Sequence, residues 1–207
     1  MSIQLGGVIV QYRVPIAIPR PLAERYRDPH YDGDDDPDSA PELLGCLYDG
    51  TVRRIEEIAE LPALVLADVT EPVVAYHSRC VIVLDRSVAA RSNLDDTSGL
   101  SALDERLAAL SSADHVERVL VFHCDGWSDT HAFCVFEKGA RSRRFARIPG
   151  GDGEVRIDDG LPLPTEPEGD ASPEMRVVSA TRALLEDATI ASLTGRSETH
   201  AFFCVRA

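Results

Sequence analysis

The stretch VERVLVFHCDGWSDTHAFCVFEKGARSRRFARI, residues 116–148, decides the fold. It opens with a strongly apolar strand from Val116 to Cys124, and the Asp125-Gly126 pair that follows is typical of a tight turn. A returning strand over 131–136 leads to a second turn at 137–139, and residues 141–148 form a third strand with a basic face. The pattern predicts an antiparallel meander whose first two strands are central and whose third is an edge or solvated strand.

Further helices and strands are predicted on both sides of this meander. Helices are expected where apolar residues recur every three or four positions, and strands where short apolar runs end at Gly, Pro or Ser. The predicted helices start at Ser39 and cover about 51–59, 100–111 and 175–187, and the predicted strands cover 3–12, 63–67, 73–77, 79–84, 154–157 and 199–205. This order predicts an α+β fold with a mainly antiparallel sheet and packed helices, in a single domain spanning 1–207.

Two acidic segments are predicted to be mobile surface loops. Residues 28–38 hold six aspartates together with Pro and Gly and no Lys or Arg, and residues 158–174 carry four prolines among acidic residues. The first segment has the composition of a calcium loop. Counted from Asp32, however, its sixth and twelfth positions are Pro37 and Leu43, where an EF-hand needs Gly and Glu. We therefore interpret it as a solvated charge run.

The net charge narrows the classes of molecule that this chain is expected to bind. The chain has 21 Lys and Arg residues against 35 Asp and Glu residues, a formal charge of −14. An acidic surface repels phosphate backbones and anionic lipids, so we predict neither nucleic-acid nor membrane binding. A basic protein partner is one interpretation of the charge, and solubility alone is the interpretation that we favour. The sequence has no Walker-type loop, no G-x-G-x-x-G, no G-x-S-x-G and no H-E-x-x-H, and we predict no cofactor. It leaves the oligomeric state open.

The N-terminus and the cysteines indicate the compartment. Residues 1–12 lack the basic start and the long apolar core of a signal peptide, and no run approaches the roughly 18 apolar residues of a membrane span. The five cysteines are widely spread and form no C-x-x-C pair, which argues against a disulfide framework. We predict a cytoplasmic location.

Potential metal ligands gather around the first turn of the meander. Zinc is bound by His, Cys and Asp, and it usually needs three or four ligands. His123 and His131 would share a face of the sheet if the strand register allows, with Asp125 or Asp129 as a third ligand. The simpler interpretation, which we favour, is a hairpin whose histidines form hydrogen bonds at the strand ends, so no metal site is predicted.

A nucleophilic cysteine is the second chemistry considered. Cys124 beside His123, or Cys134 with His131, would supply a thiol and a base. Neighbours on one strand point to opposite faces, so the base for either thiol would have to come from elsewhere. An activated thiol also needs an accessible, electropositive setting. We favour buried structural cysteines and leave the catalytic residues unassigned.

Two further features are candidate binding elements. Arg141, Arg143 and Arg147 share one parity along the third strand, which places them on one face of the sheet, where they would pair with acidic loops or bind an anion or an acidic partner. Trp127 is the only tryptophan, and it lies at the predicted hairpin tip. It is either an exposed interface anchor or folded back onto the sheet.

Part of the chain resembles an uncharacterised bacterial domain family that is common in actinobacteria. The resemblance covers about residues 79–166, and its pattern consists of strands and turns. It includes an apolar strand ending in Asp85-Arg86, a strand ending in His123, an acidic-Gly turn at 137–139, and a Gly-Leu-Pro-Leu-Pro stretch at 160–164 with Glu166 close behind. That family has no established activity, so the resemblance implies no catalytic residues.

The sequence does not reveal a function, and three hypotheses stay open. The first, which we favour, is a non-enzymatic binding or regulatory protein, with immunity proteins as one type. It would use the 123–131 hairpin and the acidic loop as its contact surface, and the candidate binding residues are Trp127, Asp125, Asp129, Arg141 and Arg143. The second is a metal-dependent or thiol enzyme built on the His123/His131 hairpin. The third is a structural homo-oligomer joined through the 141–148 strand or the terminal strand.

Overall fold

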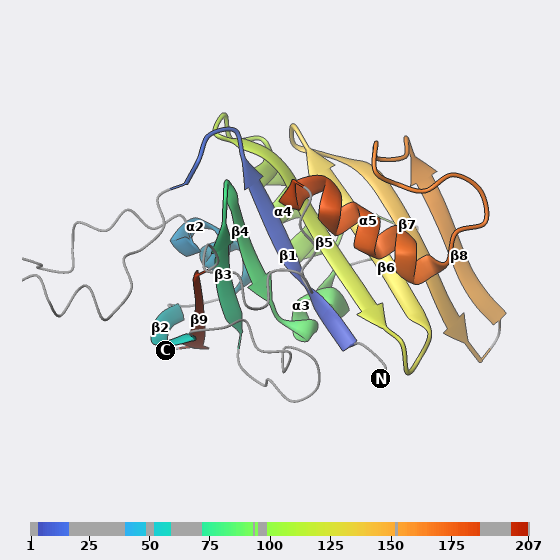
Figure 1. Cartoon of the computed structure of the whole chain (residues 1–207), viewed down its shortest axis with the longest axis horizontal. Coiled ribbons are helices and arrows are strands. Elements are labelled where there is room, and N and C mark those ends of the chain that lie inside the picture. Colours follow the sequence, from blue (N-terminus) through green and yellow to red (C-terminus); the bar gives the residue numbers. More distant parts are fainter. Residues whose placement is uncertain are drawn as a thin grey trace, which may run out of the picture.

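Strands dominate the architecture. The structure is a computed structural model, and it describes residues 4–16, 40–48, 52–58, 72–92, 94, 99–151, 153–186 and 200–206. Within these ranges one nine-stranded sheet has the order β2-β9-β3-β4-β1-β5-β6-β7-β8, and every neighbouring pair is antiparallel (Figure 1). The strands are β1 (Gln4–Tyr12), β2 (Val52–Ile58), β3 (Val73–His77), β4 (Cys80–Leu84), β5 (Val116–Asp125), β6 (Thr130–Glu137), β7 (Ala140–Gly150), β8 (Gly153–Gly160) and β9 (His200–Arg206).

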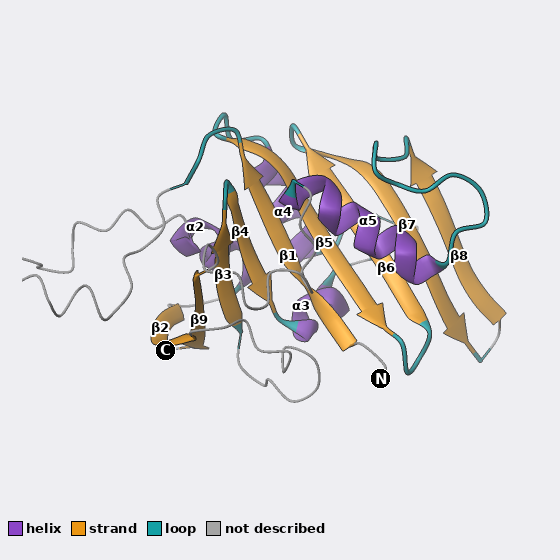
Figure 2. Ribbon diagram, viewed as in Figure 1, coloured by secondary structure: helices purple, strands orange, loops and turns teal. Residues whose placement is uncertain are grey.

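Helices cover both faces of this sheet (Figure 2). On one side lie α2 (Ala40–Leu47), α3 (Arg86–Arg91) and α4 (Ala102–Ser111), and on the other lies α5 (Pro173–Leu185). We name the two sides the α4 face and the α5 face. Because both faces are covered, the central strands are apolar on both sides, and β3 and β4 are buried along their whole length.

Each face has its own apolar core. Val121 and Phe136 pack with Leu107 on the α4 face, and Phe122 and Phe133 pack with helix α5 on the other. The alternation follows from strand geometry, since successive side chains point to opposite faces. β1 joins the two halves of the sheet because it pairs with β4 on one side and β5 on the other.

The starts of two helices follow the capping rules. Ser101 and Asp104 form a reciprocal capping box at the start of α4. Ser172 caps α5, and the first residue of that helix is Pro173. The cap fixes the first turn of α5 beside strands β7 and β8.

The antiparallel α+β prediction is confirmed, and β5, β6 and β7 form the predicted meander. The predicted edge position of the 141–148 strand is wrong, because β8 pairs with β7 along eight residues. The terminal strand β9 also lies inside the sheet, between β2 and β3. Neither of the strands proposed for oligomer formation is therefore a free edge in the described sheet, whose outer strands are β2 and β8.

The predicted helix over 51–59 is wrong. Val52, Ile55 and Ile58 recur with a helical period, but residues 52–58 form strand β2, which pairs with β9 from the other end of the chain. A register irregularity between Arg54 and Glu56 accompanies this pairing. Partner pairing from a distant segment has overridden the local period.

The predicted loops have different outcomes. The acidic segment 28–38 and the predicted strand 63–67 lie outside the described residues. The segment 158–174 is shorter than predicted, because residues 158–160 complete β8 and residues 173–174 begin α5. The irregular part is therefore 161–172.

None of the described helices is both long enough and apolar enough to span a bilayer.

Candidate functional site

The β5–β6 hairpin presents Trp127 to solvent. Asp125 and Thr130 are the last paired residues, so four residues form the turn. The backbone N–H of Trp127 donates to the Asp125 carboxylate at 2.9 Å, and Asp129 has a left-handed φ of 53°. The tryptophan is 78% exposed. Of the two sequence interpretations, the exposed aromatic is confirmed.

The two hairpin histidines lie on opposite faces of the sheet. His123 pairs with Ala132, and His131 pairs with Cys124. Directly paired residues share a face, so this register sends His123 to the α4 face and His131 to the α5 face. The zinc hypothesis required both histidines on one face of the sheet, and that expectation is therefore wrong. Within the described ranges, no group of three or more His, Cys, Asp or Glu residues is arranged to hold a metal ion.

On the α5 face, a thiol contacts an imidazole, and the imidazole contacts a carboxylate. Cys124 Sγ is 3.3 Å from His131 Nδ1, and His131 Nε2 is 3.2 Å from the Asp129 carboxylate. Hydrogen-bond chemistry then assigns a thiol that donates to Nδ1 and an Nε2–H that donates to Asp129. We call these three residues the Cys124 relay. Both Cys124 and His131 are buried, and only the carboxylate reaches solvent.

Burial keeps the Cys124 thiol protonated. It raises the pKa of Cys124 to about 12, and the nearby carboxylates of Glu174 and Asp125 act in the same direction. The two Cys–His pairs considered from the sequence do not form, because His123 and Cys134 both face α4 while Cys124 and His131 face α5. The pair that does form, Cys124 with His131, depends on strand register and could not be found from spacing alone.

His123 is isolated from this relay. Its Nδ1 is buried, and it has no hydrogen-bond partner within the described part of the chain. Burial lowers the pKa of His123, and the positive charge of Arg86 adds to the effect while Asp125 opposes it. The lowered pKa favours the neutral imidazole, whose Nδ1 would lie 3.2 Å from a Cβ atom built on Gly6.

The basic strand is split between the two faces. Arg143 pairs with Val135 but Arg141 pairs with Phe136, because a register shift falls between these positions. The parity prediction that placed Arg141 on the same face as Arg143 is therefore wrong. Arg141 and Arg144 face α4, whereas Arg143 and Arg147 face α5.

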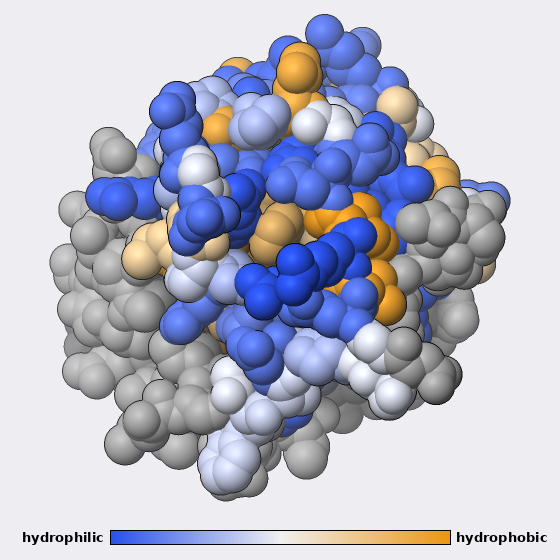
Figure 3. Space-filling model, turned by 90° about the vertical axis from the view of Figure 1, so that its right-hand side faces the viewer, coloured by the Kyte–Doolittle hydropathy of each residue, from blue (hydrophilic) through white to orange (hydrophobic). Residues whose placement is uncertain are grey.

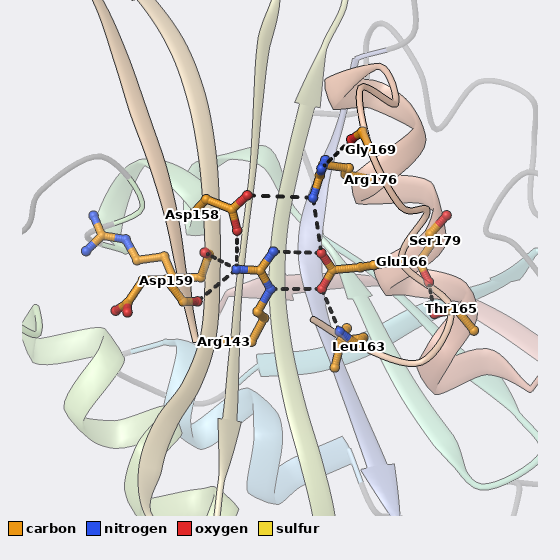
Figure 4. Close-up of polar contacts among 10 residues, drawn as sticks. Arg143, Asp158, Asp159, Leu163, Thr165, Glu166, Gly169, Arg176 and Ser179 are labelled. Carbon is orange, nitrogen blue, oxygen red and sulfur yellow. Dashed lines mark hydrogen bonds and ion pairs between the residues drawn. The ribbon is translucent and has the colours of Figure 1, made fainter. Parts of the chain in front are cut away.

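Arg143 is the centre of a buried polar network (Figure 4). Its Nε and Nη2 donate to the two carboxylate oxygens of Glu166 at 2.9 and 2.7 Å. Its Nη1 lies 2.6 Å from Asp158 and donates to the Asp159 carbonyl at 2.9 Å. The Arg143 side chain is 1% exposed and that of Glu166 is 0% exposed. The hydrogen bonds and charge of these partners raise the pKa of Arg143, so the guanidinium stays charged.

Sequence reasoning found only part of this network. Arg143 was a candidate because of its basic strand, and Glu166 was noted beside the Gly-Leu-Pro-Leu-Pro stretch without a role. The available signal was an acidic residue in a proline-rich loop that follows an arginine-bearing strand. The backbone N–H of Leu163 also donates to Glu166 at 2.8 Å, so the glutamate fixes its own loop as well as Arg143.

A row of polar residues crosses the outer half of the α5 face. Cys124, His131, Arg147 and Arg156 are successive cross-strand partners on β5, β6, β7 and β8. The two arginines of this row line an open pocket of about 280 Å³ that is bounded by β7, β8, the loop before α5 and the start of α5. Viewed from the β8 side, the molecule shows mainly hydrophilic side chains around a small apolar area (Figure 3).

Comparisons with protein-family models, with curated proteins and with solved structures found no match for this chain.

Proposed function

We propose that this chain is a non-enzymatic binding protein that regulates a protein partner, and that the tip of the β5–β6 hairpin is its contact surface. The observation that carries the proposal is the 78% exposure of Trp127 on a turn held by two well-paired strands. A large aromatic side chain in water gains free energy when a partner buries it, and tryptophan is among the residues most enriched in binding hot spots.

The charges around the tip indicate the kind of partner. Asp125 and Asp129 flank Trp127, and the chain as a whole carries −14. A fitting partner would therefore have an apolar pocket for the indole ring with basic residues around its rim. Immunity proteins that neutralise a basic partner belong to this type. The expected location is the cytoplasm, where the thiols stay reduced.

The test is site-specific crosslinking from the hairpin tip. A photoreactive phenylalanine analogue replaces Trp127 in cells of the source organism, and the crosslinked protein is identified and purified. Trp127→Ala should then weaken binding of the purified partner by about thirtyfold or more, the loss expected of a hot-spot residue. Leu161→Ala, which removes another highly exposed apolar side chain outside the hairpin, should leave the affinity unchanged.

Two kinds of result would contradict the proposed binding function. If no protein crosslinks from position 127, or if Trp127→Ala and Leu161→Ala bind the partner equally well, the hairpin tip is not a contact surface. Turnover of a small molecule by the purified chain would also contradict a purely binding role.

A second candidate function is thiol chemistry, and the Cys124 relay is the observation that favours it. A thiol, an imidazole and a carboxylate in contact have the order found in thiol-dependent catalysis. The raised pKa of Cys124 opposes this role, since the thiolate is the nucleophile. Selective labelling of Cys124 by an electrophilic probe at neutral pH, lost in His131→Ala, would favour the enzyme over the binding protein.

A further inference from the structure

The pocket on the α5 face brings together three arginines from three elements. Arg147 comes from β7, Arg156 from β8 and Arg176 from the second turn of α5, and all three line the same cavity of about 280 Å³. The convergence is unexpected on a chain with a net charge of −14. The three side chains meet because of the strand register and the position of α5, so the fold brings them together and closeness in the sequence does not.

The guanidinium groups of Arg147 and Arg156 keep N–H donors that have no hydrogen-bond partner among the described residues. One Glu154 carboxylate holds both Arg147 and Arg156, each through its Nε atom. The Nη groups of these two arginines form no other hydrogen bond among the described residues. Their side chains are 40% and 72% exposed, so these nitrogens face water. Each guanidinium therefore keeps donors that a ligand can reach.

Arg176 is held in place by a backbone carbonyl, an aromatic ring and two longer ion pairs. Its Nη2 donates to the Gly169 carbonyl at 2.9 Å (Figure 4). Its guanidinium lies over the Phe145 ring at 5.4 Å. The Nη1 atom of Arg176 forms ion pairs with the Asp158 and Glu166 carboxylates at 3.7 Å each, and both carboxylates contact Arg143 at shorter distances. Arg176 therefore shares its two carboxylate partners with Arg143.

The buried network beneath the pocket preorganises it. Arg143 and Glu166 fix the loop before α5, and Asp158 is held against Arg143. A site whose groups are already in place loses little conformational entropy when a ligand binds.

From these observations we propose that the pocket is a binding site for a phosphate-type oxyanion, either free or as the phosphate group of a small organic molecule. A planar carboxylate offers its acceptor oxygens in a single plane, as Glu166 does to Arg143. A tetrahedral phosphate instead offers acceptors in several directions, which suits guanidiniums that approach from three separate elements. The small volume fits a phosphate with a modest organic group beside Phe145 and Pro173. This proposal is independent of the hairpin-binding function.

The experiment is a calorimetric titration of the full chain with inorganic phosphate and with phenyl phosphate, at constant ionic strength. Acetate serves as the planar anion for comparison. Saturable binding of a phosphate compound, with acetate at least about tenfold weaker, supports the site. Tighter binding of phenyl phosphate than of inorganic phosphate identifies an organic phosphate as the ligand, and the reverse order identifies the free ion.

Arginine variants locate the site. Arg156→Ala, on the exposed edge strand, should weaken phosphate binding by about tenfold or more, the loss expected for a hydrogen bond to a charged group. Arg182→Ala removes an exposed arginine of α5 outside the pocket and should leave the affinity unchanged. Trp127→Ala should also have no effect, which separates this proposal from the hairpin function. Absence of phosphate binding, or equal losses in Arg156→Ala and Arg182→Ala, would overturn it.

Discussion

Arg143 and Glu166 form a two-point ion pair that is almost completely removed from water, with side-chain exposures of 1% and 0%. The pair joins strand β7 to the loop before α5. Two charges buried in this way are stable only together, because either one alone would keep its desolvation cost without its main partner. This contact joins residues that lie 23 positions apart in the sequence.

Glu166→Gln should destabilise the fold strongly. The change leaves the Arg143 guanidinium buried with a weaker partner, and breaking a buried ion pair typically costs about 3–5 kcal/mol of unfolding free energy. Chemical denaturation measures the loss, and Glu168→Gln, an exposed position in the same loop, is the matched control and should have little effect. Replacing both Arg143 and Glu166 by Met should lower the unfolding free energy by less than the summed losses of Arg143→Met and Glu166→Met, each made alone. Strict additivity would show that the two side chains are not coupled.

The buried thiols should make stability fall at high pH. Burial raises the pKa values of Cys80, Cys124 and Cys134 from 9.0 to about 12. Between these values the unfolded chain has lost thiol protons that the native chain keeps, so the unfolding free energy decreases as the pH rises. Urea denaturation at pH 8 and pH 10 measures the decrease. A variant with Ala at all three positions should lose less stability between the two pH values than the parent chain.

The same burial predicts inert thiols. At pH 8 an alkylating reagent should leave these three cysteines of the native protein unmodified, whereas all three should react in denaturant, as mass spectrometry of the peptides would show. Fast modification of Cys124 in the native chain would contradict this expectation and would favour the thiol-enzyme candidate.

The local features of this fold were predictable from sequence, and the pairing-dependent features were not. The meander follows from apolar strands separated by turn residues, and α4 and α5 follow from helical periodicity, since all of these signals lie within short windows. Strand β2 was predicted as a helix, because its partner β9 lies at the far end of the chain and leaves no mark on the local pattern.

In the candidate sites, too, local features could be predicted from the sequence and features that depend on strand pairing could not. Trp127 was found because a turn is a local signal, but its exposure required the structure. Arg141 was placed on the wrong face because parity counting fails at a register shift. The Cys124–His131 contact and the arginine pocket both depend on which residues face one another across strands, and patterns within short windows of the sequence do not show that register.

Gly7→Ala should be among the most destabilising changes in β1. This glycine pairs with both β4 and β5, and a Cβ atom built on it would lie 2.1 Å from the Val83 carbonyl oxygen. That oxygen is part of a central strand and cannot move without disturbing the sheet, so the expected cost is at least about 3 kcal/mol. Gly45→Ala is the control, since its Cβ would meet nothing within 4 Å, and in helix α2 it should stabilise by about 1 kcal/mol. Thermal unfolding of both variants distinguishes a steric cause from a general intolerance of alanine.

The single tryptophan gives a direct test of the hairpin tip. Because the side chain of Trp127 is largely in water, its fluorescence should already have the long-wavelength emission of exposed indole and should shift little on unfolding. The neighbouring carboxylates of Asp125 and Asp129 repel anions, so caesium should quench the emission more effectively than iodide at the same ionic strength, when the quenching by each ion is expressed relative to its quenching of a free tryptophan derivative. Changing both aspartates to Asn should raise quenching by iodide toward that by caesium. Short-wavelength emission from the native protein, or equal quenching by the two ions in the parent chain, would contradict an exposed indole within an acidic rim and would remove the basis for a partner with a basic-rimmed pocket.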